Sequence, residues 1–502
     1  GVLDRCRDLI TKNQPGSNVV RYLLYRLNNK VIKRQLSLDQ CNKLSYLYLE
    51  YGCIPFDEMP FCSSLINHNP RLVDVFSCMD HIGREHELLA RYIKNNTEIE
   101  GQLYTPKSEI TEFTELENLV EKYNGALYYK HGNRKLNLYR DYIYIQGYEE
   151  ATLQIIRILM ELAGNGIKGY FQAVDSWLQS NPDHAVDCPD KREALKDMFE
   201  HSRVAFIYGS AGTGKTTLIN HISNFFNGSS KLFLAHTNPA VDNLKRKVTA
   251  SNSTYSTITR FLARGDIQVE YDLLIIDECS TVSNSDMLKI LEKAKYQLLI
   301  LVGDTYQIES ITFGNWFSIA QEFAPEKAVY ELRIPYRTSN NKLITLWDKI
   351  RNLEEDSQEH LVKNGYSRRL DYSIFKYNND DAIILCLNYN GFYGINNINT
   401  LLQANNPHEP VQWGIQTYKV DDPILFNEME RFAPLIYNNL KGKIVGIEKS
   451  EDQIQFDVEV EKAIHQLEVL GYDLELLGHT DDNNSIIRFL VDKEEDTDED
   501  IN

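Results

Sequence analysis

The chain has 502 residues and a formal net charge of −19 at pH 7, a length that predicts roughly three or four domains, each with its own buried core. It contains no apolar run near the ~20 residues that a membrane-spanning helix needs, and residues 1–14 carry no apolar signal-peptide core. Its eight cysteines include no C-x-x-C pair. These features exclude a membrane-spanning helix and a disulfide-stapled secreted domain, and they predict a cytoplasmic protein with reduced thiols.

The first predicted region, residues 1–183, begins with helices. Helical spacing runs through Leu3–Leu49, and another helix is predicted over Arg84–Tyr92. His86 in that helix lies between two glutamates but has no second ligand one turn later. The sequence therefore favours a surface helix over a metal site there. Irregular spacing likewise favours buried thiols over a zinc site among Cys41, Cys53, Cys62, Cys78, His68 and His81.

The same region continues with a predicted hairpin and a helix. Two Tyr-rich strands, Ala126–His131 and Leu136–Gln146, are expected to meet at a Gly132-Asn133 turn. Glu149–Ala163 is then predicted to be helical. No catalytic set is recognisable before residue 184, so partner binding, DNA binding and bracing of a neighbouring domain all stay open as its role.

A glycine-rich loop within residues 204–217, VAFIYGSAGTGKTT, predicts a nucleotide site. A short apolar strand ends in the G-x-x-x-x-G-K-[ST] pattern, whose glycines let successive backbone N–H groups turn around phosphate oxygens. Lys215 is expected to reach the β- and γ-phosphates, and the Thr216 hydroxyl to hold Mg²⁺. The alternative is a glycine turn that ends in Lys-Thr by chance. The predicted nucleotide-binding residues are Gly209, Ser210, Ala211, Gly212, Thr213, Gly214, Lys215, Thr216 and Thr217.

A second apolar strand, Leu273–Ile276, ends in the paired carboxylates Asp277 and Glu278. Asp277 is predicted to complete the Mg²⁺ site, and Glu278 to orient and deprotonate the attacking water. A strand that ends in an acidic turn is common, so this interpretation depends on the phosphate loop about sixty residues upstream.

A third strand, Gln297–Val302, ends in Gly303-Asp304-Thr305-Tyr306-Gln307. A Gly-Asp-x-x-Gln motif after an Asp-Glu strand resembles the superfamily 1 helicases, in which the matching Gln contacts the γ-phosphate and couples hydrolysis to movement. Tyr330–Thr338, YELRIPYRT, looks like motif IV of that family, which implies that Arg337 points at the γ-phosphate. The other interpretation of Gln307 and Arg337 is that both are solvated loop residues.

The resemblance also implies contacts with nucleic acid. Leu232–Thr237 followed by Asn238–Leu244 is similar to motif Ia, which implies that Thr237 and Asn238 touch the nucleic-acid backbone. Lys245-Arg246-Lys247 follows directly. It either supplies the local positive potential that a nucleic-acid groove needs or is a solvated helix face.

Two later segments are similar to the RecD-like branch. Ala382–Asn390 is expected to be a strand, followed by an Asn-rich turn at Gly391, Asn396 and Asn399. Asp421–Asn427 and Asn438–Val445 resemble a two-part pattern of the small SH3-like barrel inserted in that branch, with Asp-Asp in place of Gly-Asp and Asn-Asn in place of Asn-Gly. The branch implies 5′-to-3′ movement on single-stranded DNA.

Two family features have no counterpart. Asp190–Leu195 lacks the Gln that reads the adenine edge in the family, so ATP is implied by the resemblance alone. The His-x-x-Gln-Gly and Thr-Arg motifs expected after the insert match no segment, and the chain starts at Gly1 rather than Met. We therefore expect a fragment of a longer protein. Seven carboxylates within residues 492–500 account for part of the negative charge.

The predicted fold class is α/β, a P-loop NTPase (RecA-like) parallel sheet with an α/β N-terminal region and a small SH3-like β-barrel insert. The expected function is an ATP-dependent helicase or translocase that uses ATP and Mg²⁺ on single-stranded DNA or RNA, with no membrane partner. The alternative is a regulatory P-loop ATPase switch that binds partners without translocating. Trp316 is either a ring that stacks on a base or a tryptophan packed in the core. The expected boundaries are an accessory region at 1–183, motor domain 1 at 184–325, a partial motor domain 2 at 326–404, the insert at 405–490 and an acidic segment at 491–502.

Overall fold

The computed structural model consists of two units, residues 1–339 and residues 340–502. Within them the structure describes residues 1–14, 17, 20–21, 24, 39–40, 48–49, 82–181, 186–265, 269–307, 313–336, 338–367, 384–389, 391–414, 416–427, 436–437, 439–464, 474–481 and 484–492. Among these residues no helix is both long and apolar enough to span a bilayer.

The chain begins with helix α1 (Val2–Thr11), none of whose residues is buried. Strands β1 (Asp39–Gln40) and β2 (Tyr48–Leu49) then pair antiparallel. Residues 39–40 and 48–49 of the segment Leu3–Leu49, which contains helical spacing, are therefore strands. The cysteines and histidines weighed as a zinc site, residues 41, 53, 62, 68, 78 and 81, lie outside the described residues.

A small α/β module occupies residues 82–145. Helices α5 (Glu85–Glu98) and α6 (Leu116–Ala126) pack on a three-stranded antiparallel sheet in the order β3-β5-β4. The strands are β3 (Thr105–Pro106), β4 (Leu136–Tyr139) and β5 (Tyr142–Ile145), and the short helices η1 (Lys107–Glu109) and η2 (Tyr129–Arg134) connect elements. Their shared core contains Leu89, Ile93, Val120, Leu136 and Ile143.

Two predictions for this module are wrong in detail. The hairpin turns at Arg140-Asp141 rather than at Gly132-Asn133, because residues 129–134 form η2 and the apolar alternation starts only at Leu136. Arg140 takes the left-handed backbone conformation (φ 52°) that such a tight turn requires. Helix α5 is not a surface helix, because seven of its residues are buried, including His86.

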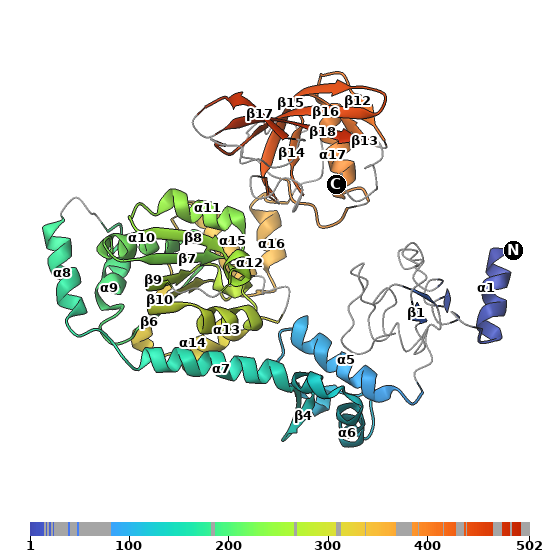
Figure 1. The fold of residues 1–502 in the computed structure, drawn as a ribbon, viewed down its shortest axis with the longest axis horizontal. Coiled ribbons are helices and arrows are strands. Elements are labelled where there is room, and N and C mark those ends of the chain that lie inside the picture. The colour runs from blue at the N-terminus through green and yellow to red at the C-terminus, as the bar shows by residue number, and fades with distance from the viewer. Residues whose placement is uncertain are drawn as a thin grey trace. The chain divides into compact units, whose positions relative to one another are not determined.

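Helix α7 (Gln146–Ala163) connects the module to the larger part of the first unit, and it confirms the helix predicted over Glu149–Ala163. Figure 1 shows α7 running from the module along the six-stranded sheet. Its buried residues Ile155 and Leu159 belong to the core on that side of the sheet. Thr152 on the same helix accepts a hydrogen bond from the Asn284 amide of helix α13 (Asn284–Lys293) at 2.7 Å.

The six-stranded sheet is parallel throughout, in the order β11-β6-β10-β9-β7-β8. Its central strands are almost continuously apolar because both of their faces are covered. This is the predicted P-loop NTPase sheet, and it confirms the α/β fold class. The strands are β6 (Val204–Gly209), β7 (Lys231–Ala235), β8 (Ser253–Thr257), β9 (Glu270–Ile276), β10 (Lys295–Gly303) and β11 (Val329–Leu332).

Helices cover both faces of this sheet (Figure 1). One apolar cluster joins α7, α13, α12 (Ile258–Ala263) and α14 (Trp316–Phe323) to one face. The other face packs against α8 (Tyr170–Ser180), α9 (Pro189–Asp197), α10 (Lys215–Phe225) and α11 (Asn238–Lys247). Short helices η3 (Cys279–Thr281) and η4 (Glu326–Ala328) complete the domain.

Strand β11 corrects the predicted boundary at residue 325. Val329–Leu332 pairs in parallel with Phe206–Gly209 of β6, so it is the edge strand of the first sheet and not part of a second lobe. Strand β11 pairs there because its apolar residue Leu332 is buried against the end of β6.

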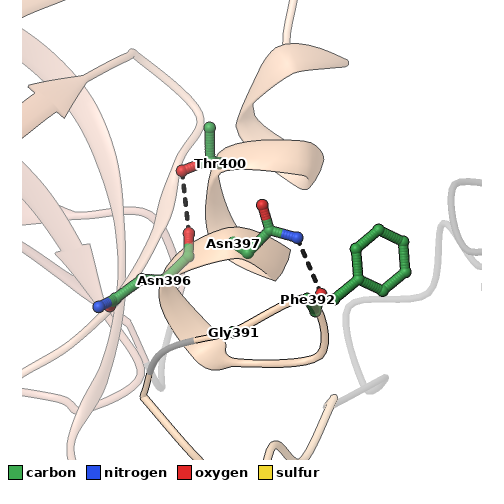
Figure 2. A pocket seen from close by; sticks show the side chains of 5 residues that line it. All are labelled: Gly391, Phe392, Asn396, Asn397 and Thr400. Carbon is green, nitrogen blue, oxygen red and sulfur yellow. Dashed lines mark hydrogen bonds between the residues drawn. The ribbon is translucent and has the colours of Figure 1, made fainter.

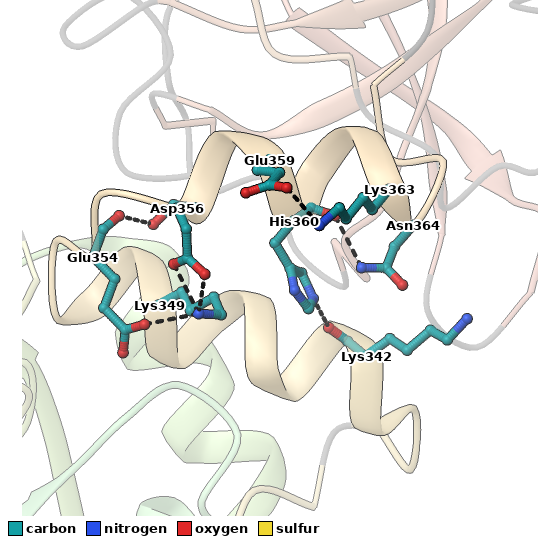
Figure 3. A network of polar contacts seen from close by, with 9 residues as sticks. Lys342, Lys349, Glu354, Asp356, Glu359, His360, Lys363 and Asn364 are labelled. Carbon is teal, nitrogen blue, oxygen red and sulfur yellow. Dashed lines mark hydrogen bonds and ion pairs between the residues drawn. The ribbon is translucent and has the colours of Figure 1, made fainter.

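The second unit opens with three helices, α15 (Asn341–Arg351), α16 (Ser357–Lys363) and α17 (Ile395–Ala404). Polar contacts join the first two: Lys349 Nζ binds Glu354 and Asp356 at 2.8 Å, and the His360 ring contacts the Lys342 carbonyl at 3.1 Å (Figure 3). The strand expected over 382–390 is absent from its described part, 384–389, and Asn396 and Asn399 lie in α17 rather than in a turn.

The rest of this unit is β-structure. A hairpin of β12 (Val411–Trp413) and β13 (Gln416–Tyr418) accompanies a five-stranded antiparallel sheet in the order β14-β15-β16-β18-β17. A side chain at Gly442 would meet Val458 at 2.7 Å, so this close crossing of strands requires glycine. The sheet falls where the insert was expected. Its strands are β14 (Pro423–Leu425), β15 (Lys441–Lys449), β16 (Gln453–Val460), β17 (Leu474–His479) and β18 (Ser485–Asp492).

Candidate functional site

The predicted site residues gather at one edge of the parallel sheet. Strands β6, β10 and β9 are neighbours, and the phosphate loop, Asp304–Gln307 and Asp277-Glu278 directly follow their carboxyl ends. Parallel strands end at the same edge, which is the usual ligand edge of an open α/β sheet. Three motifs that are up to about a hundred residues apart in sequence therefore meet in one place.

The backbone of the phosphate loop has the conformation that its sequence predicts. Gly212 and Gly214 both have φ of 85°, where other residues are strained, and Gly214 begins helix α10. A Cβ at Gly209 would lie 2.6 Å from the Thr213 hydroxyl and 2.9 Å from the Leu332 carbonyl oxygen. Each glycine is thus required by torsion or by space, which a chance Gly-rich turn would not explain.

Lys215 lies against this loop. Its ammonium group donates to the carbonyl oxygens of Gly209 at 2.6 Å and Ser210 at 3.1 Å. Thr216 and Thr217 occupy the first turn of α10, with Thr216 half-buried and Thr217 exposed. The loop therefore offers an ammonium group, a hydroxyl and the positive end of a helix to one small volume, a combination that suits a phosphate group.

The two carboxylates after β9 have distinct surroundings. Asp277 is buried, accepts the backbone N–H of Glu278 at 2.9 Å, and has its pKa raised by burial, with Lys215 opposing the rise. Burial also raises the pKa of Glu278, and the charge of Asp277 raises it further. Lys215 acts electrostatically on both carboxylates, so the three side chains form one charged cluster.

Glu278 also has an unusual backbone. Its φ of 56° lies in the left-handed region, which a glutamate seldom adopts. Strain of this kind persists where the surrounding fold over-determines a conformation, and it gathers at functional sites. Here the strand fixes the residue on one side, and η3, which Glu278 caps, fixes it on the other.

The segment after β10 is a short turn. Asp304 is buried, and its backbone and side-chain oxygens accept the N–H groups of Gln307 and Tyr306, each at 3.1 Å. Gln307 itself is exposed. Arg337 lies outside the described residues, but the preceding Tyr336 donates its backbone N–H to the Gly212 carbonyl at 2.8 Å. The chain that leads to residue 337 is therefore bonded to the phosphate loop.

Thr237 and Asn238 follow β7, two strands from β10 at the same edge. Both are exposed, and Thr237 caps helix α11 by accepting the Ala240 N–H at 3.3 Å. The Lys245–Lys247 run falls in the last turn of the same helix.

Trp316 does not fit a base-stacking role. It is fully buried in α14, and its indole N–H donates to the Val282 carbonyl at 2.8 Å. Both ring faces pack within the core cluster that includes α7 and α13, so no base can reach them. Trp316 is therefore a core residue, which was the alternative interpretation of the sequence. An indole buries a large apolar area once its N–H has a partner.

Sequence reasoning gave no role to Lys191, which the structure places beside the phosphate loop. It is 1% exposed, pairs with Asp187 at 2.5 Å, and its ammonium group lies 4.4 Å from the centre of the Tyr336 ring. A Cβ at Gly214 would collide with that ammonium group. The i, i+4 pairing of Asp187 with Lys191 at the start of α9 was the one signal available in the sequence.

The second unit contains an open hollow of about 490 Å³, lined by Gly391, Phe392, Asn396, Asn397 and Thr400. The Asn397 amide donates to the Phe392 carbonyl at 2.8 Å, and the Thr400 hydroxyl donates to the Asn396 carbonyl at 2.9 Å (Figure 2). The polar side chains of its lining are Asn396, Asn397 and Thr400, none of which carries a charge.

Comparisons with known proteins found a matching domain family and similar solved structures. Residues 189–369 match an AAA domain. No curated protein sequence matches the chain. The chain is similar to the Pif1 helicase from Candida albicans at 18% identity, over 61% of this chain and 84% of that one, with a TM-score of 0.36. A Bacteroides Pif1 helicase solved with ADP-AlF3 and ssDNA is 16% identical over 62% and 81% of the two chains, with a TM-score of 0.35. The PRRSV helicase is 16% identical over 29% and 33%, with a TM-score of 0.22.

Proposed function

We propose that this chain is the motor portion of an ATP-dependent helicase or translocase that couples ATP hydrolysis to movement on single-stranded nucleic acid. The observation that carries the proposal is the meeting of the phosphate loop, Asp277-Glu278 and Asp304–Gln307 at adjacent strand ends of one parallel sheet. The AAA-domain match over residues 189–369 supports a nucleotide-binding role for the same segment.

The nucleotide phosphates bind at residues 209–217, where Lys215 exchanges its carbonyl partners for β- and γ-phosphate oxygens. The residues present fit a magnesium ion. Thr216 and Asp277 offer hard oxygen ligands, and no set of three or more acidic, Cys or His side chains occurs within the described ranges. Mg²⁺ prefers one or two protein oxygens together with phosphates and water, and when bound it neutralises charge on the phosphates.

Glu278 is the general base in this proposal. Burial and the Asp277 charge raise its pKa, which makes its carboxylate a better proton acceptor than an ordinary exposed glutamate. Gln307 and Arg337 act as γ-phosphate sensors. Gln307 is exposed and follows the strand next to that of Glu278, which supports its role as a sensor. The hydrogen bond between Tyr336 and Gly212 supports the same role for Arg337.

Nucleic acid is the proposed partner on the adjoining surface. Exposed Thr237 and Asn238 contact its backbone beside the sensor turn, and 5′-to-3′ polarity follows if the chain belongs to the RecD-like branch. The competing proposal is a nucleotide-dependent switch that shares the same ATP site but does not move.

ATPase rates with and without single-stranded DNA or RNA separate the two proposals. A motor is strongly stimulated by the strand, and Lys215→Ala abolishes both the basal and the stimulated rates. A rate that is indifferent to every single strand, with Lys215→Ala still inactive, would favour the switch. Full activity of Lys215→Ala would overturn both proposals.

A further inference from the structure

The small module at residues 82–145 exposes a face of tyrosines that the proposed motor chemistry does not use. On the hairpin, Leu136, Ile143 and Ile145 point into the core. Period-two alternation therefore turns Tyr139, Tyr142 and Tyr144 to the outside. Tyr139 and Tyr142 are directly opposite in register and are 56% and 42% exposed.

Tyr104 extends this face across the third strand. Thr105 is buried opposite Ile143, so Tyr104 lies on the outer side beside Tyr144, and the two ring centres are 5.2 Å apart. The Tyr104 hydroxyl donates to Glu149 at 3.2 Å, which holds the ring in place. Burial and Glu149 raise the pKa of Tyr104 to about 12, so its hydroxyl stays protonated at neutral pH. We call Tyr104, Tyr139, Tyr142 and Tyr144 the tyrosine face.

Positive charge accompanies these rings. Residues 127–145 carry four Lys or Arg residues against one Asp, in a chain whose net charge is −19. The Arg140 guanidinium lies 5.2 Å from the centre of the Tyr139 ring. At the opposite end, Glu149 and Glu150 lie close enough to Tyr144 to raise its pKa, after burial as the main cause. Phosphates are therefore attracted to the Arg140 end and repelled from the Glu149 end.

We propose that the tyrosine face is a binding platform for single-stranded nucleic acid, on which bases stack while phosphates follow the Arg140 edge. Stacking on aromatic rings tolerates any base, and sheet faces that carry aromatic residues hold two or three bases. A duplex offers no free base faces, so it is a poor ligand. The choice of nucleic acid as occupant rests on the proposed function.

The module is attached to the domain that contains the parallel sheet, so a nucleic-acid strand bound to it would also be positioned relative to that domain. Strand β5 runs directly into α7, and α7 is bonded to α13 through Thr152 and Asn284. The loop before Tyr104 accepts the Asn315 amide at its Gly101 carbonyl at 3.1 Å. A nucleic-acid strand bound to the tyrosine face is thus kept at a fixed position relative to the site on the parallel sheet.

The test measures binding of the full chain, without nucleotide, to fluorescent oligo(dT), oligo(rU) and a blunt DNA duplex by anisotropy. The double variant Tyr139→Ala/Tyr142→Ala is compared with Tyr139→Phe/Tyr142→Phe, which keeps both rings. We expect the alanine pair to bind the single strands ~5-fold or more weakly per lost ring, as the typical strength of base stacking requires. The phenylalanine pair should bind like the wild type. A larger loss on oligo(dT) than on oligo(rU) would mark DNA as the natural strand, and the reverse would mark RNA.

Arg140→Gln tests the electrostatic part separately, since loss of one phosphate contact lowers the salt dependence of binding by about one unit for every sequence. Unchanged affinity of the alanine pair for both single strands would overturn the proposal, as would an equal loss on the duplex or an equal loss in the phenylalanine pair. Because nucleotide is absent, the result is independent of the ATPase assay. An alanine-pair defect without strand-stimulated hydrolysis would keep the platform and reject the motor.

Discussion

Glu278→Gln gives the sharpest test of the candidate site, because the substitution keeps the shape of the side chain while removing the carboxylate. Loss of a positioned general base lowers the rate of its reaction by ~10²–10⁴-fold, which corresponds to about 3–5 kcal/mol of transition-state stabilisation. Nucleotide binding should be unchanged, because the phosphates are held by the loop at 209–217. The wild-type rate should also fall as the pH drops through the raised pKa of Glu278, since only the ionised form accepts a proton.

The same substitution has an expected effect on stability with a definite sign. The pKa of Glu278 is higher in the folded chain than the ordinary value, through burial first and the Asp277 charge second. Its contribution to stability is therefore fully present below the unfolded pKa and is lost as the pH rises through the folded pKa. Glu278→Gln cannot ionise, so it should be more stable than wild type at neutral pH and indistinguishable at strongly acidic pH.

Single-turnover hydrolysis, nucleotide titration and denaturant unfolding at two pH values would measure these effects. Glu270→Gln is the matched control, since it lies at the exposed start of the same strand. Hydrolysis by Glu278→Gln at the wild-type rate would refute its role as base. A neutral-pH stability below that of wild type would refute the electrostatic argument even if the rate fell.

Three further substitutions test other parts of the molecule. Lys215→Ala should abolish hydrolysis and weaken binding of a fluorescent nucleotide, whereas Lys245→Ala at an exposed position of α11 should leave both unchanged. Gly214→Ala should lose about 1–2 kcal/mol from its backbone conformation alone and more from the collision with Lys191, measured by urea unfolding. Gly228→Ala has open space around it and is the control. Trp316→Ala should destabilise the fold by about 3–5 kcal/mol, and unchanged stability would contradict its burial.

The nucleotide site was predictable because its signals are local. A strand, a glycine loop and Lys215 are contiguous in sequence, and their spacing alone defines the phosphate cradle. Burial of the Asp277-Glu278 strand could also be anticipated from its unbroken apolar run. The close approach of Lys191 to Gly214 could not be anticipated from the sequence, because it depends on how α9 packs beside α10. No spacing rule connects residues so far apart in sequence.

Elsewhere the failures have a common physical origin. Tyr128 and Tyr129 have high strand propensity, yet Tyr128 precedes η2 and Tyr129 begins it, and the edge strand β4 starts only at Leu136. The sequence also left open whether Trp316 is buried or exposed. Burial of a single aromatic residue depends on partners distant in sequence, such as the Val282 carbonyl. In each case a pairing in three dimensions overrode a local preference.

The domain boundary expected at residue 183 does not coincide with the limit of the hydrophobic core, because helix α7 lies before this boundary and packs against the sheet that follows it. Ile155 and Leu159 of α7 are fully buried against the parallel sheet. Burying each such side chain contributes about 1.5–3 kcal/mol, so these two residues stabilise the packing of α7 on the sheet. The Asn284 side chain adds a bond to Thr152 and accepts the backbone N–H of Trp316, which joins α7, α13 and α14. Helix α7 therefore belongs to the core of the parallel sheet, whereas the module at 82–145 has a separate core and is connected to the sheet through α7.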